Sequence, residues 1–316
     1  MKIPRLFALT ISLMIALPVI GQTSSEITAP GPLAPLHGTL LNPPGAVAVV
    51  VIVPGSGPTD RDGNNPLGVK AEPLKQLAEA LAARNIASIR IDKRGLFGSS
   101  AAIADANAVS IGDYAADVRN WAAAARMATG ARCVWLLGHS EGGLVVLAAG
   151  EEEGICGHIL IATSGRPLAD VIRAQLKANP ANAPIIAQAE AAITTLEKGE
   201  RVDVTPLHPA LANLFAPQVQ GYLIDLFRYR PAQLAAKLSR PMLIIQGSED
   251  LQVGEEDARA LAAARPDARL LLLPGINHVL KPVPPGDRNA NIASYASAEP
   301  RVSPAIAQAI AELVTP

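Results

Sequence analysis

Short apolar runs alternate with helix-like segments along most of this chain, and this alternation limits the folds open to it. The run at residues 46–53 is continuous and rich in valine, as expected of a strand buried on both faces of a sheet. Residues 70–84 then carry leucine and alanine at helical spacing. Strands and helices in alternation form parallel βαβ units. The sequence therefore predicts an α/β fold with a mostly parallel sheet and helices on both faces.

The remaining elements continue the same alternation, and no internal repeat interrupts it. Further strands are expected at residues 37–41, 86–91, 133–137, 158–162, 242–246 and 269–273, with the first of these antiparallel. Further helices are expected at residues 111–127, 141–150, 255–264 and 303–314.

One interval breaks the alternation. Roughly 80 residues after the strand at 158–162 carry helical patterning and no clear strand, and a compact domain rarely holds a plain loop of that length. We therefore predict a helical cap at residues 166–238, inserted between two parts of the core at 22–165 and 239–316. The cap holds half of the chain's eight Phe and Tyr residues, which either pack it against the core or line a pocket. They are Phe215, Tyr222, Phe227 and Tyr229.

The first 21 residues resemble a targeting segment. Lys2 and Arg5 precede an uncharged run at residues 6–20, which ends at the small residue Gly21. These are the parts of a secretory signal peptide, and the run is shorter than the ~20 apolar residues of a membrane span. We predict a signal peptide at residues 1–21; the alternative is an uncleaved anchor. The mature protein is expected in a bacterial periplasm or outside the cell.

Composition excludes several classes of protein. Hydrophobic residues make up 49% and charged residues 17%, which excludes intrinsic disorder. The net charge is −1, no Lys/Arg cluster is present and aromatics make up 3%, so no nucleic-acid partner is expected. The glycines around Ser140 lack the third glycine of a dinucleotide fingerprint, and no His or Cys cluster has metal spacing. We expect no cofactor, no metal and a small-molecule partner.

The two cysteines, Cys133 and Cys156, lie at the starts of strands that should be neighbours in the sheet. Their Cα atoms would then lie within the ~4.4–6.8 Å that a disulfide spans. The pair forms either a disulfide, as suits an exported protein, or two buried thiols that pack as small apolar residues.

The most informative motif is Gly-His-Ser-Glu-Gly-Gly at residues 138–143, between a predicted strand and a predicted helix. A nucleophile on such a sharp turn needs a strained backbone, and side chains two positions away on either side would collide with neighbouring elements. Gly138 and Gly142 remove that clash. Ser140 is the predicted nucleophile, and the N–H of Glu141 at the helix start is a predicted oxyanion donor.

A serine hydroxyl needs a base, and His278 is the best placed of the five histidines. It follows the strand at 269–273 and so leaves the same sheet edge as Ser140. His139 lies within the turn, where its side chain is expected to point elsewhere. His158 begins a strand at the opposite edge, and His208 lies in the cap.

The base needs a carboxylate to orient it. Asp250 follows the strand at 242–246 and gives the chain order Ser, Asp, His that this type of sheet uses. Glu249 is the competing acid and Asp257 a third candidate.

These motifs resemble the α/β-hydrolases, close to serine aminopeptidase S33-like and esterase-like hydrolases. The resemblance rests on Pro54-Gly55-Ser56-Gly57, Asp92-Lys93-Arg94-Gly95, the turn at 138–143 and the segments holding Asp250 and His278. It implies an eight-stranded sheet with a cap between strands six and seven.

The resemblance also assigns roles near the first strand. It makes the N–H of Ser56 the second oxyanion donor, with Gly57 as the alternative, and Arg94 a structural arginine. The charged segment at residues 59–64 either binds a polar substrate end or fixes the oxyanion turn through ion pairs; we favour the second role.

Three functions are compatible with this pattern. The first is a serine hydrolase of carboxylic esters that forms an acyl-enzyme. The second is a peptidase with the same triad, which would need a carboxylate near the pocket mouth; Glu141, Glu190 and Asp225 are the candidates. The third is a non-catalytic binding protein on this scaffold, which is disfavoured because all three triad residues are present.

Overall fold

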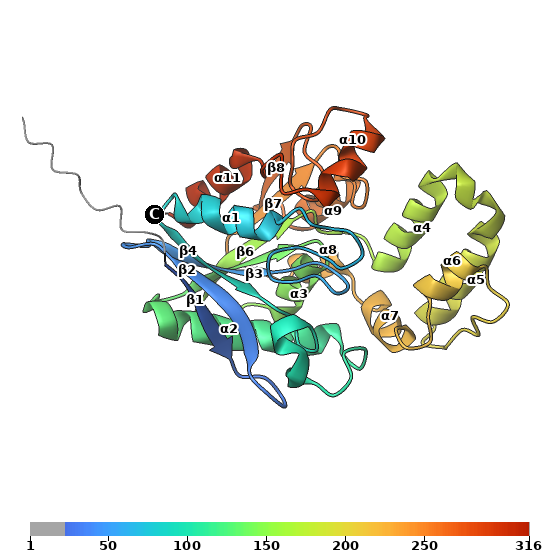
Figure 1. Ribbon diagram of the computed structural model, residues 1–316, viewed down its shortest axis with the longest axis horizontal. Helices are drawn as coiled ribbons and strands as arrows, with labels where there is room; N and C mark the ends of the chain where they lie inside the picture. Colours follow the sequence, from blue (N-terminus) through green and yellow to red (C-terminus); the bar gives the residue numbers. More distant parts are fainter. Residues whose placement is uncertain (1–22, 316) are drawn as a thin grey trace, which may run out of the picture.

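The computed structural model describes residues 23–315, in which one eight-stranded sheet forms the centre of the core (Figure 1). The strand order is β1-β2-β4-β3-β5-β6-β7-β8. β2 pairs antiparallel with β1 and β4, and the other strands pair in parallel. The strands are β1 (Thr23–Ala29), β2 (Leu36–Asn42), β3 (Ala48–Val53), β4 (Ile86–Ile91), β5 (Val134–His139), β6 (Ile155–Ile161), β7 (Met242–Gly247) and β8 (Arg269–Leu273). The predicted mostly parallel, eight-stranded α/β fold is confirmed.

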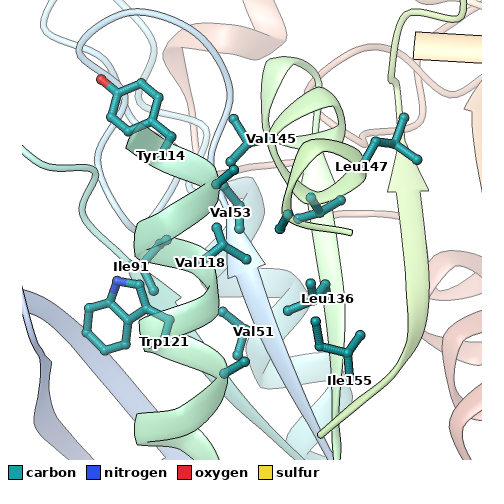
Figure 2. Close-up of a cluster of buried hydrophobic side chains, with 14 of the residues drawn as sticks. Val51, Val53, Ile91, Tyr114, Val118, Trp121, Leu136, Val145, Leu147 and Ile155 are labelled. Carbon is teal, nitrogen blue, oxygen red and sulfur yellow. The ribbon is translucent and has the colours of Figure 1, made fainter. Parts of the chain in front are cut away.

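Helices cover both faces of this sheet, which explains why the central strands are apolar on both sides. On one face, α2 (Ile111–Thr129), α3 (Glu141–Ala149) and α9 (Glu255–Ala264) bury one layer of side chains. On the other face, α1 (Pro73–Ala82) and α11 (Pro304–Val314) bury a second layer. Figure 2 shows the first layer, where Trp121 and Val118 of α2 pack over Val51 and Leu136.

Local chemistry explains where individual elements begin. α2 starts at a capping box, in which Ser110 and Asp113 exchange side-chain-to-backbone hydrogen bonds. α1 begins at Pro73 rather than near residue 70, because proline suits the first turn of a helix.

Two strands differ from the prediction. β6 begins at Ile155, before the predicted residue 158, and runs through Gly157. A Cβ at Gly157 would lie 2.5 Å from the Trp135 ring, so glycine here marks close packing rather than a turn. β1 was not predicted, because its sequence TSSEITA is polar and it pairs only with β2.

The segment between β6 and β7 is helical and extends away from the sheet (Figure 1). Its α-helices are α4 (Leu168–Ala178), α5 (Ile186–Glu197), α6 (Pro209–Leu214), α7 (Gln220–Phe227) and α8 (Pro231–Ala235). Ile193, Leu196, Phe215 and Phe227 form a small core of its own. Arg173 of α4 bonds Glu190 and Glu197 of α5, which ties the two longest of these helices together.

Cys133 and Cys156 form a disulfide, with Cα atoms 5.3 Å apart. It joins the start of β5 to β6, so these cysteines form a disulfide rather than two buried thiols.

No helix within residues 23–315 is long and apolar enough to cross a membrane. The predicted signal peptide at residues 1–21 lies outside the described residues.

Candidate active site

Ser140 occupies a strained turn between β5 and α3. Its backbone has φ 55° and ψ −122°, a conformation that non-glycine residues rarely adopt. The turn is held by two hydrogen bonds: the N–H of Ser140 donates to the carbonyl of Ile161 at 2.9 Å, and the N–H of Gly143 donates to the carbonyl of Ser140 at 3.0 Å. The Ser140 side chain lines a cavity. The geometry therefore presents the hydroxyl at the carboxyl edge of the sheet.

The glycines on either side of Ser140 are sterically required. A Cβ at Gly138 would lie 2.2 Å from the carbonyl oxygen of Gly142, and a Cβ at Gly142 would lie 2.3 Å from that of Val53. A Cβ at Gly143 would lie 2.0 Å from Oγ1 of Thr163. These approaches are far inside van der Waals contact, so α3 can pack directly on β3 and on the segment after β6 only without side chains here.

Asp250 and His278 meet at the same edge of the sheet. The Nδ1 of His278 lies 2.8 Å from Oδ2 of Asp250, and both side chains are buried. The other Asp250 oxygen accepts hydrogen bonds from the N–H groups of Gln252 and Val253. Burial alone would raise the pKa of Asp250, but His278 and these N–H groups outweigh it and hold that pKa below its ordinary value. Asp250 therefore stays ionised and can orient an imidazole.

The two competing acids have other partners. Glu249 accepts a hydrogen bond from the N–H of Gly286. Asp257 is fully buried and accepts hydrogen bonds from the N–H groups of Gly165 and Arg166 and from the Arg166 guanidinium. Of the three predicted candidates, Asp250 is the carboxylate that the structure brings to His278.

No hydrogen bond joins Ser140 to His278 among the residues that the structure describes. Catalytic hydrogen bonds are often long in free enzymes and shorten only when substrate binds. His278 does lie beside the residue that precedes Ser140, because the His139 ring centroid is 4.9 Å from that of His278.

His139 does not point away from the site, which corrects the expectation from the sequence. Its Nε2 lies 2.9 Å from the carbonyl oxygen of His278 and must carry the proton, because a carbonyl only accepts. Burial and, second, the nearby His278 lower the pKa of His139 to about 4. His139 is therefore neutral at neutral pH and fixes the backbone of His278. The sequence places His139 at the end of a strand, and nothing in that position indicates that its side chain would bind the His278 backbone.

The turn after β3 lies beside Ser140. A Cβ at Gly55 would lie 3.2 Å from Cβ of Ser140, and Ser56 and Gly57 line the same cavity. Within residues 23–315, the backbone N–H groups of Ser56 and Glu141 form no hydrogen bond. Both groups predicted as oxyanion donors are thus free to bind a ligand oxygen.

Ion pairs hold the charged segment at residues 59–64. The Arg61 guanidinium bonds Asp92 at 2.6 Å and Glu26 at 3.1 Å, and Asp62 pairs with Arg90. Arg94 bonds Asp117 of α2 at 2.6 Å. These contacts agree with the structural role favoured for the segment and with the role assigned to Arg94.

A cavity of about 590 Å³ opens above Ser140 between the sheet and the helices that follow β6. Its walls are mostly aliphatic, with Leu144 on the core side and Val171, Leu223 and Leu226 on the other. Tyr222 and Tyr229 line the cavity, whereas Phe215 and Phe227 are buried among the helices. Both roles considered for these aromatics therefore occur: the two tyrosines line the pocket and the two phenylalanines pack within the helical segment.

Groups of three or more His, Cys, Asp or Glu residues that could bind a metal do not occur within residues 23–315.

The sheet, the turn at Ser140 and the helical insertion define the chain as an α/β-hydrolase. A family model described as serine aminopeptidase, S33, matches residues 67–281. The chain belongs to this family, as its motifs suggested.

Esterase EstD from Thermotoga maritima is 30% identical over 252 residues, which cover 75% of this chain and 55% of that protein. The chain thus spans about half the length of this curated relative. Est1E from Butyrivibrio proteoclasticus has a similar fold, with a TM-score of 0.57 at 16% identity, covering 92% of this chain and 98% of the other. A proline iminopeptidase from Mycobacterium smegmatis gives a TM-score of 0.54 at 15% identity, covering 81% and 92%. These structural likenesses establish the fold, on which many activities occur.

Proposed function

We propose that this protein is a serine hydrolase that cleaves carboxylic esters. Ser140 attacks the ester carbonyl while His278 takes its proton, and Asp250 orients His278 and stabilises the imidazolium. The N–H groups of Ser56 and Glu141 hold the oxyanion. His278 then returns the proton to the departing alcohol, which leaves an acyl-enzyme on Ser140, and water releases the acid by the same steps. The observation that carries the proposal is the buried 2.8 Å contact between His278 and Asp250 beside the strained turn of Ser140.

The cavity favours an ester with an apolar acyl or alcohol group. Its aliphatic walls offer contact area but few charges for a zwitterionic substrate. The three carboxylates considered as anchors for a peptide ammonium all have partners: Glu141 pairs with Lys93, Glu190 pairs with Arg173 and Lys177, and Asp225 accepts a hydrogen bond from the N–H of Ile111. This argues for ester hydrolysis over removal of N-terminal residues.

The nucleophile is tested by labelling with a fluorophosphonate followed by peptide mapping. We expect modification of Ser140 in the wild-type protein and none in Ser140→Ala, which should fold normally and lose turnover. Retained turnover in Ser140→Ala contradicts the proposed function.

The family name keeps peptide hydrolysis as the alternative. A panel of p-nitrophenyl esters and aminoacyl anilides separates the two activities, because the triad chemistry is common to both. We expect turnover of the esters; turnover of the anilides alone would assign the protein as a peptidase.

We also propose that the protein is exported. The charged start and apolar run of residues 1–21 support this, and so does the disulfide between Cys133 and Cys156, since disulfides persist in oxidising compartments. Fractionation of cells that produce the full chain, with mass analysis of its N-terminus, should find a periplasmic or extracellular protein that begins near residue 22.

A further inference from the structure

Lys93 is a buried cation at the floor of the cavity, and the triad mechanism does not use it. It follows β4 by two residues and is only 4% exposed. Its Nζ donates to the carbonyl oxygen of Gly55 at 2.7 Å and to Oε1 of Glu141 at 3.2 Å. The same ammonium lies 5.1 Å from the ring centroid of Tyr114. One charge therefore joins the turn after β3, the start of α3 and the side of α2.

The contact with Gly55 acts on one predicted oxyanion donor directly. The carbonyl of Gly55 and the N–H of Ser56 belong to one peptide unit, and in a trans peptide they point in opposite directions. When the ammonium holds the carbonyl, the N–H must face away from Lys93. A charged donor on the carbonyl also polarises the amide and makes its N–H a stronger donor.

The contact with the Glu141 carboxylate ties the ammonium to the helix whose start carries the other predicted donor. The N–H of Glu141 is the first free donor of α3, and the Glu141 side chain is bonded to the same ammonium. Rotation of the Gly55–Ser56 peptide would break its contact with Lys93. The Ser140–Glu141 peptide is fixed separately, by the hydrogen bond from the N–H of Gly143 to the carbonyl of Ser140. The ammonium therefore sets the Ser56 N–H relative to the start of α3, where the Glu141 N–H lies.

Stability alone is a weak reason for this arrangement. Taking an ammonium and a carboxylate out of water is costly for both groups, and apolar side chains of similar volume often stabilise such a position more. A methionine would fill the space of Lys93 without that cost. The position nevertheless carries a lysine with a carbonyl and a carboxylate as partners.

We propose that Lys93 is a positioning residue that holds the Gly55–Ser56 peptide against the start of α3, so that the N–H groups of Ser56 and Glu141 converge on the oxyanion. The inference rests on the proposed function, since it assumes acyl transfer at Ser140. Lys93 acts through the Gly55–Ser56 peptide and does not itself exchange a proton with the substrate.

The test is Lys93→Met, measured on a p-nitrophenyl ester and with a trifluoromethyl ketone, which binds as an analogue of the tetrahedral intermediate. Loss of a whole oxyanion donor costs on the order of 10²–10³ in kcat; misplacement of the donors should cost about tenfold to a hundredfold in kcat, with little change in KM. Affinity for the ketone should fall by the same factor. Active sites are counted by endpoint labelling with a fluorophosphonate, so loss of folded protein does not enter kcat.

Two further variants separate positioning from an unpaired charge, because Lys93→Met leaves the Glu141 carboxylate buried without its cation. The double variant Lys93→Met/Glu141→Gln removes that charge, and the loss of kcat should persist relative to Glu141→Gln alone. Lys93→Arg keeps a cation and should recover part of kcat. A matched control is Arg94→Met, which removes the neighbouring buried cation; it should lower thermal stability and leave the ketone affinity unchanged.

The inference is overturned if Lys93→Met keeps kcat per labelled site and its ketone affinity, or if the double variant regains the kcat of Glu141→Gln. Either result leaves the proposed function standing, provided that wild-type protein is labelled at Ser140. Failure of labelling at Ser140 would instead refute the proposed function.

Discussion

At the scale of single residues, the site is built from side chains whose neighbours restrict them to one state. Asp250 is ionised because two N–H groups and His278 face it, and His139 is neutral because burial and the nearby His278 lower its pKa. The consequence is an imidazole at His278 that has its orientation set from both sides, by a side chain and through its own backbone.

The role of Asp250 leads to a direct prediction. Asp250→Asn should lower kcat by several orders of magnitude, on the order of 10⁴-fold, because an amide no longer selects the tautomer that accepts the serine proton. Steady-state kinetics on an activated ester measure the loss. Glu249→Gln is the matched control, since Glu249 bonds the Gly286 backbone instead, and its kcat should stay near wild type. A larger loss in Glu249→Gln would reassign the acid.

His158 predicts a pH dependence of stability. It is fully buried in β6, its Nε2 lies 3.1 Å from the carbonyl of Gly150, and burial lowers its pKa to about 4. The unfolded chain binds the proton near pH 6.5 and the folded chain only near pH 4, so the free energy of unfolding falls as the pH drops through this interval. The slope from one such group reaches about 1.4 kcal/mol per pH unit.

Chemical denaturation at several pH values measures this slope in the wild type and in His158→Gln, which keeps a donor for Gly150. The variant should lose less stability between pH 6.5 and pH 4. Equal slopes would show that protonation of His158 does not contribute.

At the scale of elements, the junction between the core and the helical insertion depends on one carboxylate. Asp257 of α9 accepts hydrogen bonds from two successive N–H groups, those of Gly165 and Arg166, at the point where the chain leaves the sheet. A Cβ at Gly165 would lie 2.2 Å from the Asp257 carbonyl oxygen, so the chain passes directly over α9 here. Arg166 also lines the cavity.

Asp257→Ala should therefore loosen the insertion. Leaving the buried N–H of Gly165 without a partner costs on the order of 1–3 kcal/mol, and the half-buried Arg166 loses its anchor. We therefore expect a lower melting temperature and a raised KM with a smaller change in kcat. Thermal melts and steady-state kinetics measure both. Faster hydrogen exchange in α4 and α8 should accompany the change; unaltered KM and exchange would contradict this role.

At the scale of the whole molecule, the disulfide closes a loop of 23 residues between neighbouring strands. A cross-link over such a loop contributes about 3 kcal/mol by restricting the unfolded chain. The double variant Cys133→Ala/Cys156→Ala should unfold at lower temperature by several degrees and keep its kcat, because the bond lies at the sheet edge opposite Ser140. Differential scanning calorimetry measures the change, and an unchanged melting temperature would contradict it.

Most of the core was predictable from the sequence, because buried parallel strands are unbroken apolar runs and alternation with helices indicates that they are parallel. The contact of His278 with Asp250 was predictable for the same reason, since both follow strands at one edge. The role of Lys93 was not, because a lysine two residues after a strand reads as a solvated loop residue. Nor was that of His139, since the direction of a side chain at a strand end depends on the neighbouring loops. Which of the four aromatic residues in the helical segment line the cavity could also be seen only in the structure.

The cavity draws its floor from one part of the chain and much of its wall from another. Ser140 and Glu141 belong to the sheet and its helices, whereas Val171, Tyr222 and Leu223 belong to the insertion. On the proposed function, substitutions at residues 168–231 would change the shape of the cavity and leave the proposed catalytic residues untouched. This stretch is therefore the rational target for engineering the range of substrates.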